Sequence, residues 1–306
     1  GDLGRSDETA PILEACLAYF RHTGNKTQIM ACLNALGITQ RFIGNEEKAA
    51  DYFRAQLEIA RELKNRHEEA TALNNLCTAM NVMENFVEAE QMLKECLVIR
   101  RELNDEAGVS STLINLGVAL YNQGRDAEVK PLLYEAIEIS RRINQPRNLA
   151  GALGNLGGIL KREGQYGEAL KLFMQGLETH RNTGYPYGIA IALDNVGTAY
   201  YYLGNEREAL YYLRQSIREA RDIKADFIAL DALVWVAGIR ARNGERQFAL
   251  ELLGMIHHHP KTDPETVQNI EELLSHMAVG MNLKSLRVVE ETGKGLDLST
   301  VINEIL

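Results

Sequence analysis

Residues 72–103 read ALNNLCTAMNVMENFVEAEQMLKECLVIRREL, and this stretch decides the fold. Its first half places apolar side chains at spacings of three and four, as at Leu73, Leu76 and Met80, which is typical of one face of an α-helix. A second helical pattern follows a short break near Glu84. The stretch therefore predicts two helices joined by a tight turn, which we call the A helix and the B helix.

The same pair of patterns recurs every 40 residues in six copies without an insertion. One apolar position holds Leu33, Leu73, Leu113, Leu153, Leu193 and Leu233. Four residues later the side chains are small, at Gly37, Cys77, Gly117, Gly157, Gly197 and Ala237. The turn holds Gly44, Gly124, Gly164, Gly204 and Gly244, with Glu84 in the second copy. A helical pair cannot bury its apolar face alone, so neighbouring pairs must stack into a solenoid.

The period also predicts where the helices lie. A helices are expected at 28–43, 68–83, 108–123, 148–163, 188–203 and 228–243, each followed by a B helix. The chain opens in the phase of a B helix, at about residues 8–22, because Leu13 occupies the position of Phe53. We expect either an A partner upstream of residue 1 or a B-like helix that serves as an N-terminal cap.

The period is lost after residue 258. Asp263 followed by Pro264 offers a capping side chain and a proline in the first turn, so a helix is expected from there to about Gly280. Two shorter helices are expected, one near 283–292 and one that Ser299 caps. The predicted domains are a lone B helix of a truncated repeat in 1–27, six repeats in 28–258 and a helical cap in 259–306.

Composition and charge narrow the function classes. Hydrophobic residues make up 45% of the chain and charged residues 25%, which is typical of a folded core. The net charge of −9 argues against nucleic acid as a partner, and the absence of an 18-residue apolar run argues against a membrane span. The cysteines lack a CxxC pair, which favours buried thiols in a reducing cytoplasm over a zinc site: Cys16, Cys32, Cys77 and Cys96.

No catalytic or metal-binding motif stands out. The sequence has no GxxxxGK[ST], GxSxG or HExxH pattern, and the Gly293-Lys294 pair lacks the flanking residues of a phosphate-binding loop. His257, His258 and His259 would point in different directions from a helix end. We therefore predict no enzyme activity, no metal and no cofactor.

The stretch at 72–103 and the stretch AIALDNVGTAYYYLGNEREALYYLRQSI at 190–217 resemble the tetratricopeptide repeat, and the resemblance covers about residues 4–258. The 40-residue form is similar to repeats of kinesin light chains and Pins-type adaptors, and to the sensor arrays of bacterial signal-transduction ATPases with numerous domains (STAND), which include the maltotriose-responsive activators. This resemblance implies an all-α, right-handed superhelical solenoid whose A helices line the concave face.

The tail favours the STAND group among these relatives. FALELLGMIHHHP at 248–260 and GKGLDLSTVINEIL at 293–306 resemble the C-terminal end of such ATPase regulators. The resemblance implies a cytoplasmic sensor domain that binds a peptide or protein on its concave face, with an ATPase domain upstream in the full-length protein. The alternatives are a small-molecule inducer receptor with a pocket in repeats four to six, and a constitutive assembly scaffold.

The resemblance also places a stripe of side chains on the concave face, and this stripe passes through one asparagine in each of four consecutive repeats: Asn75, Asn115, Asn155 and Asn195. An amide can pair with the N–H and the C=O of a bound main chain together. The alternative is that these asparagines bond neighbouring helices and contact no ligand.

Repeat four is unusual because its A helix contains Gly151, Gly154, Gly157 and Gly158, of which only Gly157 fits the repeat pattern. Each helical glycine costs about 1 kcal/mol relative to alanine, so the other three cost about 3 kcal/mol. Gly151 and Gly158 fall on the inner stripe and predict a recess whose floor is bare backbone; the alternative is tighter packing between A helices. The predicted ligand-binding residues are Asn75, Ser111, Asn115, Asn122, Gly151, Asn155, Gly158, Arg162, Asn195, Tyr202, Trp235 and Arg242. Of these, the aromatic and arginine side chains are expected to form the walls of the recess.

Overall fold

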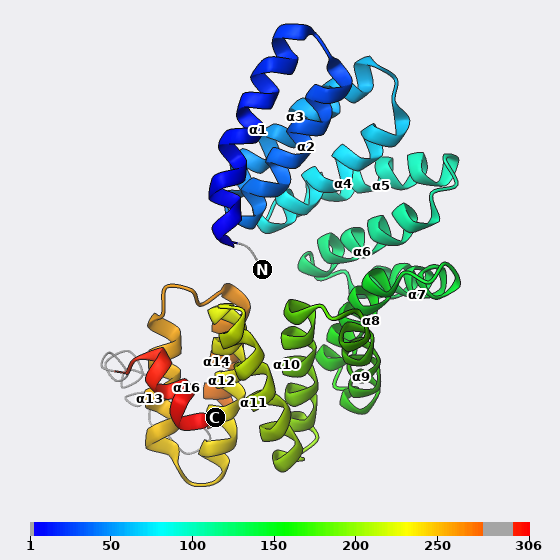
Figure 1. Cartoon of the computed structure of the whole chain (residues 1–306). Helices are drawn as coiled ribbons and strands as arrows, with labels where there is room; N and C mark the ends of the chain where they lie inside the picture. Colours follow the sequence, from blue (N-terminus) through cyan, green and yellow to red (C-terminus); the bar gives the residue numbers. More distant parts are fainter. Residues whose placement is uncertain (1–2, 278–295) are drawn as a thin grey trace. The chain divides into compact units, whose positions relative to one another are not determined.

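The computed structural model describes residues 3–277 and 296–306, and every regular element within them is a helix (Figure 1). Successive helices pack as hairpins, as the 40-residue period predicts. The helices are α1 (Leu3–Thr23), α2 (Lys26–Phe42), α3 (Glu46–Glu62), α4 (Arg66–Val82), α5 (Phe86–Glu102), α6 (Glu106–Asn122), α7 (Asp126–Arg142), α8 (Pro146–Arg162), α9 (Tyr166–Thr183), α10 (Pro186–Tyr202), α11 (Glu206–Asp222), α12 (Asp226–Arg242), α13 (Arg246–His258), α14 (Pro264–Met277) and α16 (Leu298–Ile305).

The even-numbered helices α2 to α12 are the six A helices, and each begins two residues before its predicted start. Helix α1 is longer than the expected lone B helix, and α14 begins at Pro264 as predicted. Helix α16 corrects one expectation, because its N-cap is Asp297, whose side chain accepts from the backbone N–H of Thr300 at 3.1 Å, and Ser299 lies inside the helix. The helix expected near 283–292 lies outside the described residues.

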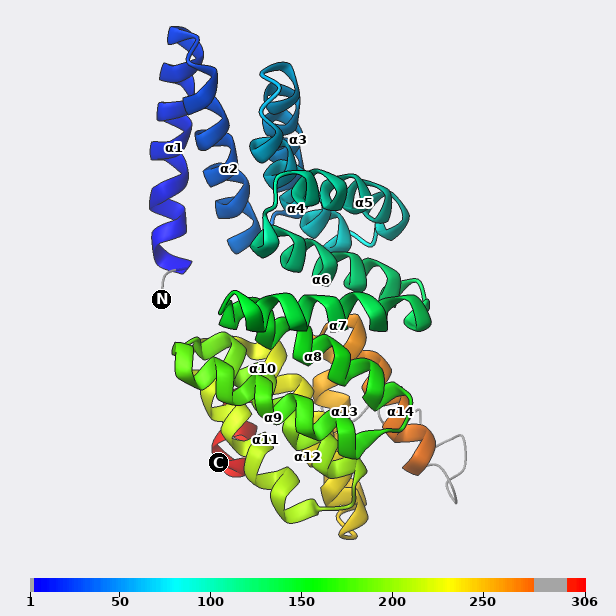
Figure 2. The same cartoon turned by 90° about the vertical axis from the view of Figure 1, so that its right-hand side faces the viewer.

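The chain divides into two compact units, residues 1–155 and 156–306. The boundary falls inside the glycine-rich helix α8 and differs from the three-part division predicted from the period. Within residues 1–155, the helix pairs stack in chain order (Figure 2). No helix in the described part of the chain is both long enough and apolar enough to cross a membrane.

The A-to-B turns share one backbone solution. Their left-handed residues are Gly44, Gly124, Gly164, Gly204 and Gly244, with φ between 73° and 92°. In the second repeat Glu84 takes the same conformation, with φ of 60°, so the turn survives where the glycine is missing. The small residue near the middle of each A helix has a packing reason as well. A Cβ on Gly157 would lie 2.5 Å from the ring of Phe173, so glycine allows the A and B helices of repeat four to approach closely.

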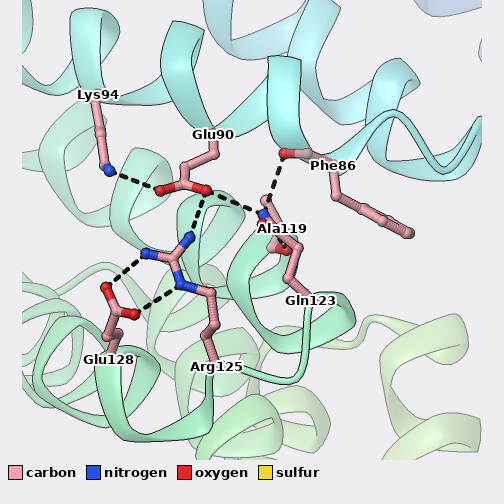
Figure 3. A network of polar contacts seen from close by, with 7 residues as sticks. All are labelled: Phe86, Glu90, Lys94, Ala119, Gln123, Arg125 and Glu128. Carbon is pink, nitrogen blue, oxygen red and sulfur yellow. Dashed lines mark hydrogen bonds and ion pairs between the residues drawn. The ribbon is translucent and has the colours of Figure 1, made fainter.

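A network of ion pairs around the buried carboxylate of Glu90 connects repeats two and three within residues 1–155 (Figure 3). The carboxylate of Glu90 on α5 accepts from Lys94 at 2.6 Å, from Gln123 at 3.1 Å and from Arg125 at 2.7 Å, and Arg125 also pairs with Glu128. Burial alone would raise the pKa of Glu90. Hydrogen bonds from Lys94 and Gln123, together with the positive charges of Lys94 and Arg125, lower it below its ordinary value.

The core of residues 156–306 is centred on α12, which is buried around most of its circumference. Trp235 is 1% exposed, and it belongs to one apolar cluster with Ile270 and Leu273 of α14 and Ile302 of α16. Figures 1 and 2 both show α14 beside α12. Helices α14 and α16 therefore pack on the last repeat.

Candidate functional site

In residues 1–155 the predicted inner stripe is an accessible surface on α2, α4, α6 and the first part of α8. Asn75, Ser111 and Asn115 are half-buried, while Asn122 is exposed and donates to the carbonyl of Val118 at 2.9 Å. These side chains are therefore all at least partly accessible to solvent. We call Asn75, Asn115, Asn155 and Asn195, which occupy one position in four consecutive repeats, the ladder asparagines.

The ladder asparagines of α4 and α6 use their amide nitrogens for packing. Asn75 Nδ2 donates to Asn34 Oδ1 at 2.9 Å, and Asn115 Nδ2 donates to Asn74 Oδ1 at 3.1 Å and to Thr78 Oγ1 at 3.3 Å. The Oδ1 atoms of Asn75 and Asn115 accept no hydrogen bond from a described residue, and neither is a buried unpaired atom. In both repeats the amide nitrogen is bonded to the preceding A helix, and the carbonyl oxygen accepts no hydrogen bond from a described residue.

Asn155 and Asn195 differ from the first two ladder residues because neither side chain has a hydrogen bond within the described residues. The physical reason lies 41 residues earlier. Asn75 and Asn115 find amide partners at Asn34 and Asn74, whereas the corresponding position for Asn155 is the apolar Ile114. Asn155 therefore keeps both its donors and its acceptor for other partners.

The glycines of α8 are not explained by close packing. A Cβ on Gly151, Gly154 or Gly158 would meet nothing within 4 Å, in contrast to Gly157. The space beside these three glycines is therefore open, and tight contact between helices does not account for them. Whether the opening receives a ligand remains a prediction.

Exposed apolar side chains at the stripe were not included in the predicted set. Ile38 and Phe42 on α2 are 38% and 69% exposed, and Val82 on α4 is 59% exposed. Phe42 and Val82 occupy the repeat position at which the third and fourth repeats have Asn122 and Arg162. A change from polar to large apolar at one repeat position is the sequence signal that could have identified them.

The predicted recess walls in repeats five and six are largely covered. Trp235 was expected to form part of the recess wall, and this is wrong, because its side chain is only 1% exposed. Its ring centroid lies 5.2 Å from those of Tyr201 and Tyr202, and it shares an apolar cluster with Ile270 and Leu273 of α14. The ring of Tyr202 stacks on that of Tyr166, with ring centroids 4.6 Å apart. The Tyr202 hydroxyl donates to Oε1 of Glu272 on α14 at 2.7 Å. Sequence spacing could place Trp235 on the A-helix stripe but could not show that α14 lies on it.

Arg162 and Arg242 are both exposed. Arg242 donates to the carbonyl of Tyr201 at 3.0 Å, and its Cζ lies 3.7 Å from the centroid of the Tyr201 ring. With Arg246, Leu273 and neighbouring residues it lines a pocket of about 200 Å³. That volume is below the roughly 300–1,000 Å³ of most small-molecule sites.

Three carboxyl groups, those of Asp194, Asp231 and Glu265, come together where α14 meets the A helices. Asp231 Oδ1 accepts from Thr266 Oγ1 at 3.2 Å and from Asn269 Nδ2 at 2.8 Å. Burial, with the adjacent carboxyl of Asp231, raises the pKa of Asp194 well above its ordinary value. No group of three His, Cys, Asp or Glu side chains suited to a metal ion occurs in the described residues.

Family comparison identifies the repeats. Tetratricopeptide repeat models match residues 31–66, 68–142 and 148–221. None of the curated protein sequences compared with the chain matches it.

Several solved structures share the fold at 14–17% sequence identity, a level that shows the fold alone. A signal-transduction ATPase with numerous domains and a tetratricopeptide repeat sensor, from Pyrococcus horikoshii, is 17% identical with a TM-score of 0.63; the match covers 99% of this chain and 50% of that one. BtubC from P. vanneervenii is 16% identical with a TM-score of 0.60, over 73% of this chain and 93% of that one. A Rap protein complexed with competence and sporulation factor is 14% identical with a TM-score of 0.65; the match covers 92% of this chain and 76% of that one.

Proposed function

The chain belongs to the tetratricopeptide repeat family, and from that premise we propose that it is a protein-interaction sensor domain whose inner face in residues 1–155 binds a peptide segment. The observation that carries the proposal is the orientation of the ladder amides. Asn75 and Asn115 give their N–H groups to the preceding A helix and leave their carbonyl oxygens open.

This arrangement suits a partner main chain. Neighbouring helices lie about 8–10 Å apart. A peptide in the polyproline II conformation has three residues per turn and advances about 3.1 Å per residue, so every third N–H points the same way about 9 Å further along and can reach the next ladder oxygen. Asn155, which has no partner of its own in the described residues, can both donate and accept. The bare backbone at Gly151 and Gly154 lets a bound chain approach α8 closely.

The exposed apolar residues supply affinity that the amides do not. Ile38, Phe42 and Val82 lie on the same stripe as the ladder, and burying a large apolar side chain contributes about 1.5–3 kcal/mol. A peptide with an apolar side chain near the ends of α2 and α4 would cover them. The site therefore combines main-chain recognition with apolar anchoring.

At the finer level, the array is proposed to be the C-terminal sensor of a bacterial, cytoplasmic STAND ATPase, with binding biasing an upstream ATPase domain. The resemblance of the tail at 248–260 supports this proposal. The fold likeness to the Pyrococcus horikoshii protein also supports it, since it covers 99% of this chain and 50% of that protein. A non-catalytic role fits the family. The free thiols of Cys16, Cys32, Cys77 and Cys96 support a reducing compartment.

A small-molecule receptor is the second candidate, and the pocket beside Arg242 is the observation that favours it. Two arginines over an apolar floor would suit a small carboxylate. A constitutive scaffold would instead need a broad apolar patch on the B helices.

The test is selection of peptides from a displayed random library on the immobilised chain. The site variant is Phe42→Ser/Val82→Ser/Asn155→Ala, because none of these side chains has an internal hydrogen bond to lose. The matched control is Tyr134→Ser/Val98→Ser, at comparably exposed positions of the B helices α7 and α5. We expect selected peptides to bind the control as they bind the parent and the site variant at least tenfold more weakly. Equal binding to both variants would refute the site.

A further inference from the structure

The last two A helices do not present an open inner face, because α14 lies on it. Thr266 and Asn269 of α14 bond to Asp231 on α12 at 3.2 and 2.8 Å. Further along, Glu272 accepts from Tyr202 at the end of α10 at 2.7 Å. Helix α14 therefore reaches both α10 and α12 at positions of the predicted inner stripe.

Helix α14 packs on this face with one side buried and the other side exposed, as an amphipathic helix bound in a groove does. Its contacting residues Thr266, Asn269, Ile270 and Leu273 follow the spacing of one helical face, and all four are buried. Ile270 and Leu273 enter the apolar cluster around Trp235, while the opposite face of α14 is exposed. The inner face of α10 and α12 is thus shaped to hold an amphipathic helix.

The fit between α14 and this face is incomplete. Three polar atoms of α10 and α12 have no hydrogen-bond partner within residues 3–277 and 296–306, namely Asp194 Oδ1, Thr198 Oγ1 and Trp235 Nε1. Each of these residues is more than nine-tenths buried. An unpaired buried polar group is costly, and no described residue of α14 supplies the missing partners.

The repeat provides an internal comparison. The same three positions, 120 residues earlier, are Asn74, Thr78 and Asn115, where the amide of Asn115 bonds to both of the others. At these positions in repeats two and three the polar groups satisfy one another; in repeats five and six they do not. The unpaired groups are therefore not a general property of the fold.

Charge indicates the chemistry of a better occupant. Helix α14 carries Glu265, Glu271 and Glu272. Glu265 lies in the field of the cations Lys161 and Arg162 at the end of α8, and also in that of the carboxylates Asp231 and Asp263. Arg242 and Arg246 lie at the other end of the contact, beside Leu273 and Met277 of α14. A helix that competes with α14 would therefore be acidic.

We propose that the inner face of α10 and α12 is a helix-binding site, that α14 is its resident occupant, and that a partner protein displaces α14 with an acidic amphipathic helix. The partner helix would also supply hydrogen bonds to the side chains that α14 leaves unpaired. This inference concerns residues 156–306 and goes beyond the peptide site proposed in residues 1–155, so either can fail alone.

The test uses a labelled peptide with the sequence of α14, PETVQNIEELLSHM, and the intact chain. In the parent, a short tether keeps α14 at an effective concentration of about millimolar, so added peptide competes poorly. Thr266→Asp/Asn269→Asp places new carboxylates against Asp231 and should release α14. Gln268→Asp/Ser275→Asp adds the same charge at exposed positions and serves as the control.

We expect the release variant to bind the peptide at least tenfold more tightly than the parent or the control. Binding that is equal in all three, or loss of the helices α10 to α12 in the release variant, would show that α14 is an integral part of the fold and overturn the proposal. A second measurement needs no variant. In the parent, amide hydrogens of α14 should exchange at least ~100-fold faster than those of α12; equal protection would overturn the proposal.

Peptides selected on the site in residues 1–155 separate the two proposals. Their binding should not change in Thr266→Asp/Asn269→Asp, because that variant alters no residue of their site. Loss of α14-peptide binding with retained library-peptide binding would refute only the inference about α14.

Discussion

Alanine at Gly151, Gly154 and Gly158 should make the chain more stable and weaken its binding of selected peptides. None of the three has a positive φ, and a Cβ at each would meet open space, so alanine fits without strain. Each substitution should stabilise α8 by about 1 kcal/mol, and the triple variant by about 3 kcal/mol. The methyl groups at Gly151 and Gly154 would at the same time fill space beside α8 in the peptide site proposed in residues 1–155.

Gly157→Ala is the matched control, because it makes the same chemical change one residue from Gly158. Its Cβ would lie 2.5 Å from Cε1 of Phe173, so the ring must move. Overpacking of this kind typically costs about 1–3 kcal/mol, which should cancel or exceed the gain in helix propensity. We therefore expect stabilisation from the triple variant and none from Gly157→Ala.

Hydrogen exchange of the α8 amides measures the local gain. Because each 1.4 kcal/mol is tenfold, about 3 kcal/mol corresponds to roughly 100-fold slower exchange in the triple variant. Slower exchange with undiminished peptide binding would remove the recess from the site. Unchanged or faster exchange would refute the reasoning itself, since it would mean that the space beside these glycines is already filled.

Three further outcomes follow from the buried polar groups. The pKa of Glu90 is lowered in the folded chain, so its stabilisation is present above its unfolded pKa of about 4.3 and is lost as pH falls through the folded value; Glu90→Gln should flatten the urea stability profile between pH 3 and 6. The pKa of Asp194 is raised, so its contribution is present below about 3.9 and is lost as pH rises through the folded value; Asp194→Asn should stabilise residues 156–306 at pH 8 and not at pH 3. Asn75→Ala and Asn34→Ala should each cost about 0.5–1.5 kcal/mol and, being partners, should be non-additive in a double-mutant cycle.

The hairpins could be predicted from the sequence because their causes are local and repeated. Helical spacing, a left-handed turn residue and a small residue beside the B helix recur every 40 residues, and each contributes to a hairpin independently. The turn also tolerates a residue other than glycine, because Glu84 adopts the same left-handed conformation in the second repeat. The position of the glycine-rich α8 at the boundary between the two compact units was not predictable from periodicity.

The candidate site could be predicted only where the repeat is regular. Asn75 and Asn115 could be placed on one stripe, but the direction of each amide depends on whether the residue 41 positions earlier is polar. Trp235 was misjudged for a different reason. Its environment is set by α14, which lies outside the period, so no repeat position could indicate that the last A helices are covered.

The two units thus use one repeat position in opposite ways. In α6 the residue at this position is Asn115, a small amide that bonds to its neighbours and leaves an oxygen open. In α12 it is Trp235, whose large ring needs a covering element and whose Nε1 has no hydrogen-bond partner in the part of the chain that the structure describes. A large apolar ring on an accessible face would be costly in water, so burial under α14 follows from the residue. An unpaired N–H does not follow from it. That difference supports our proposal that the covered face, like the open one, binds a partner.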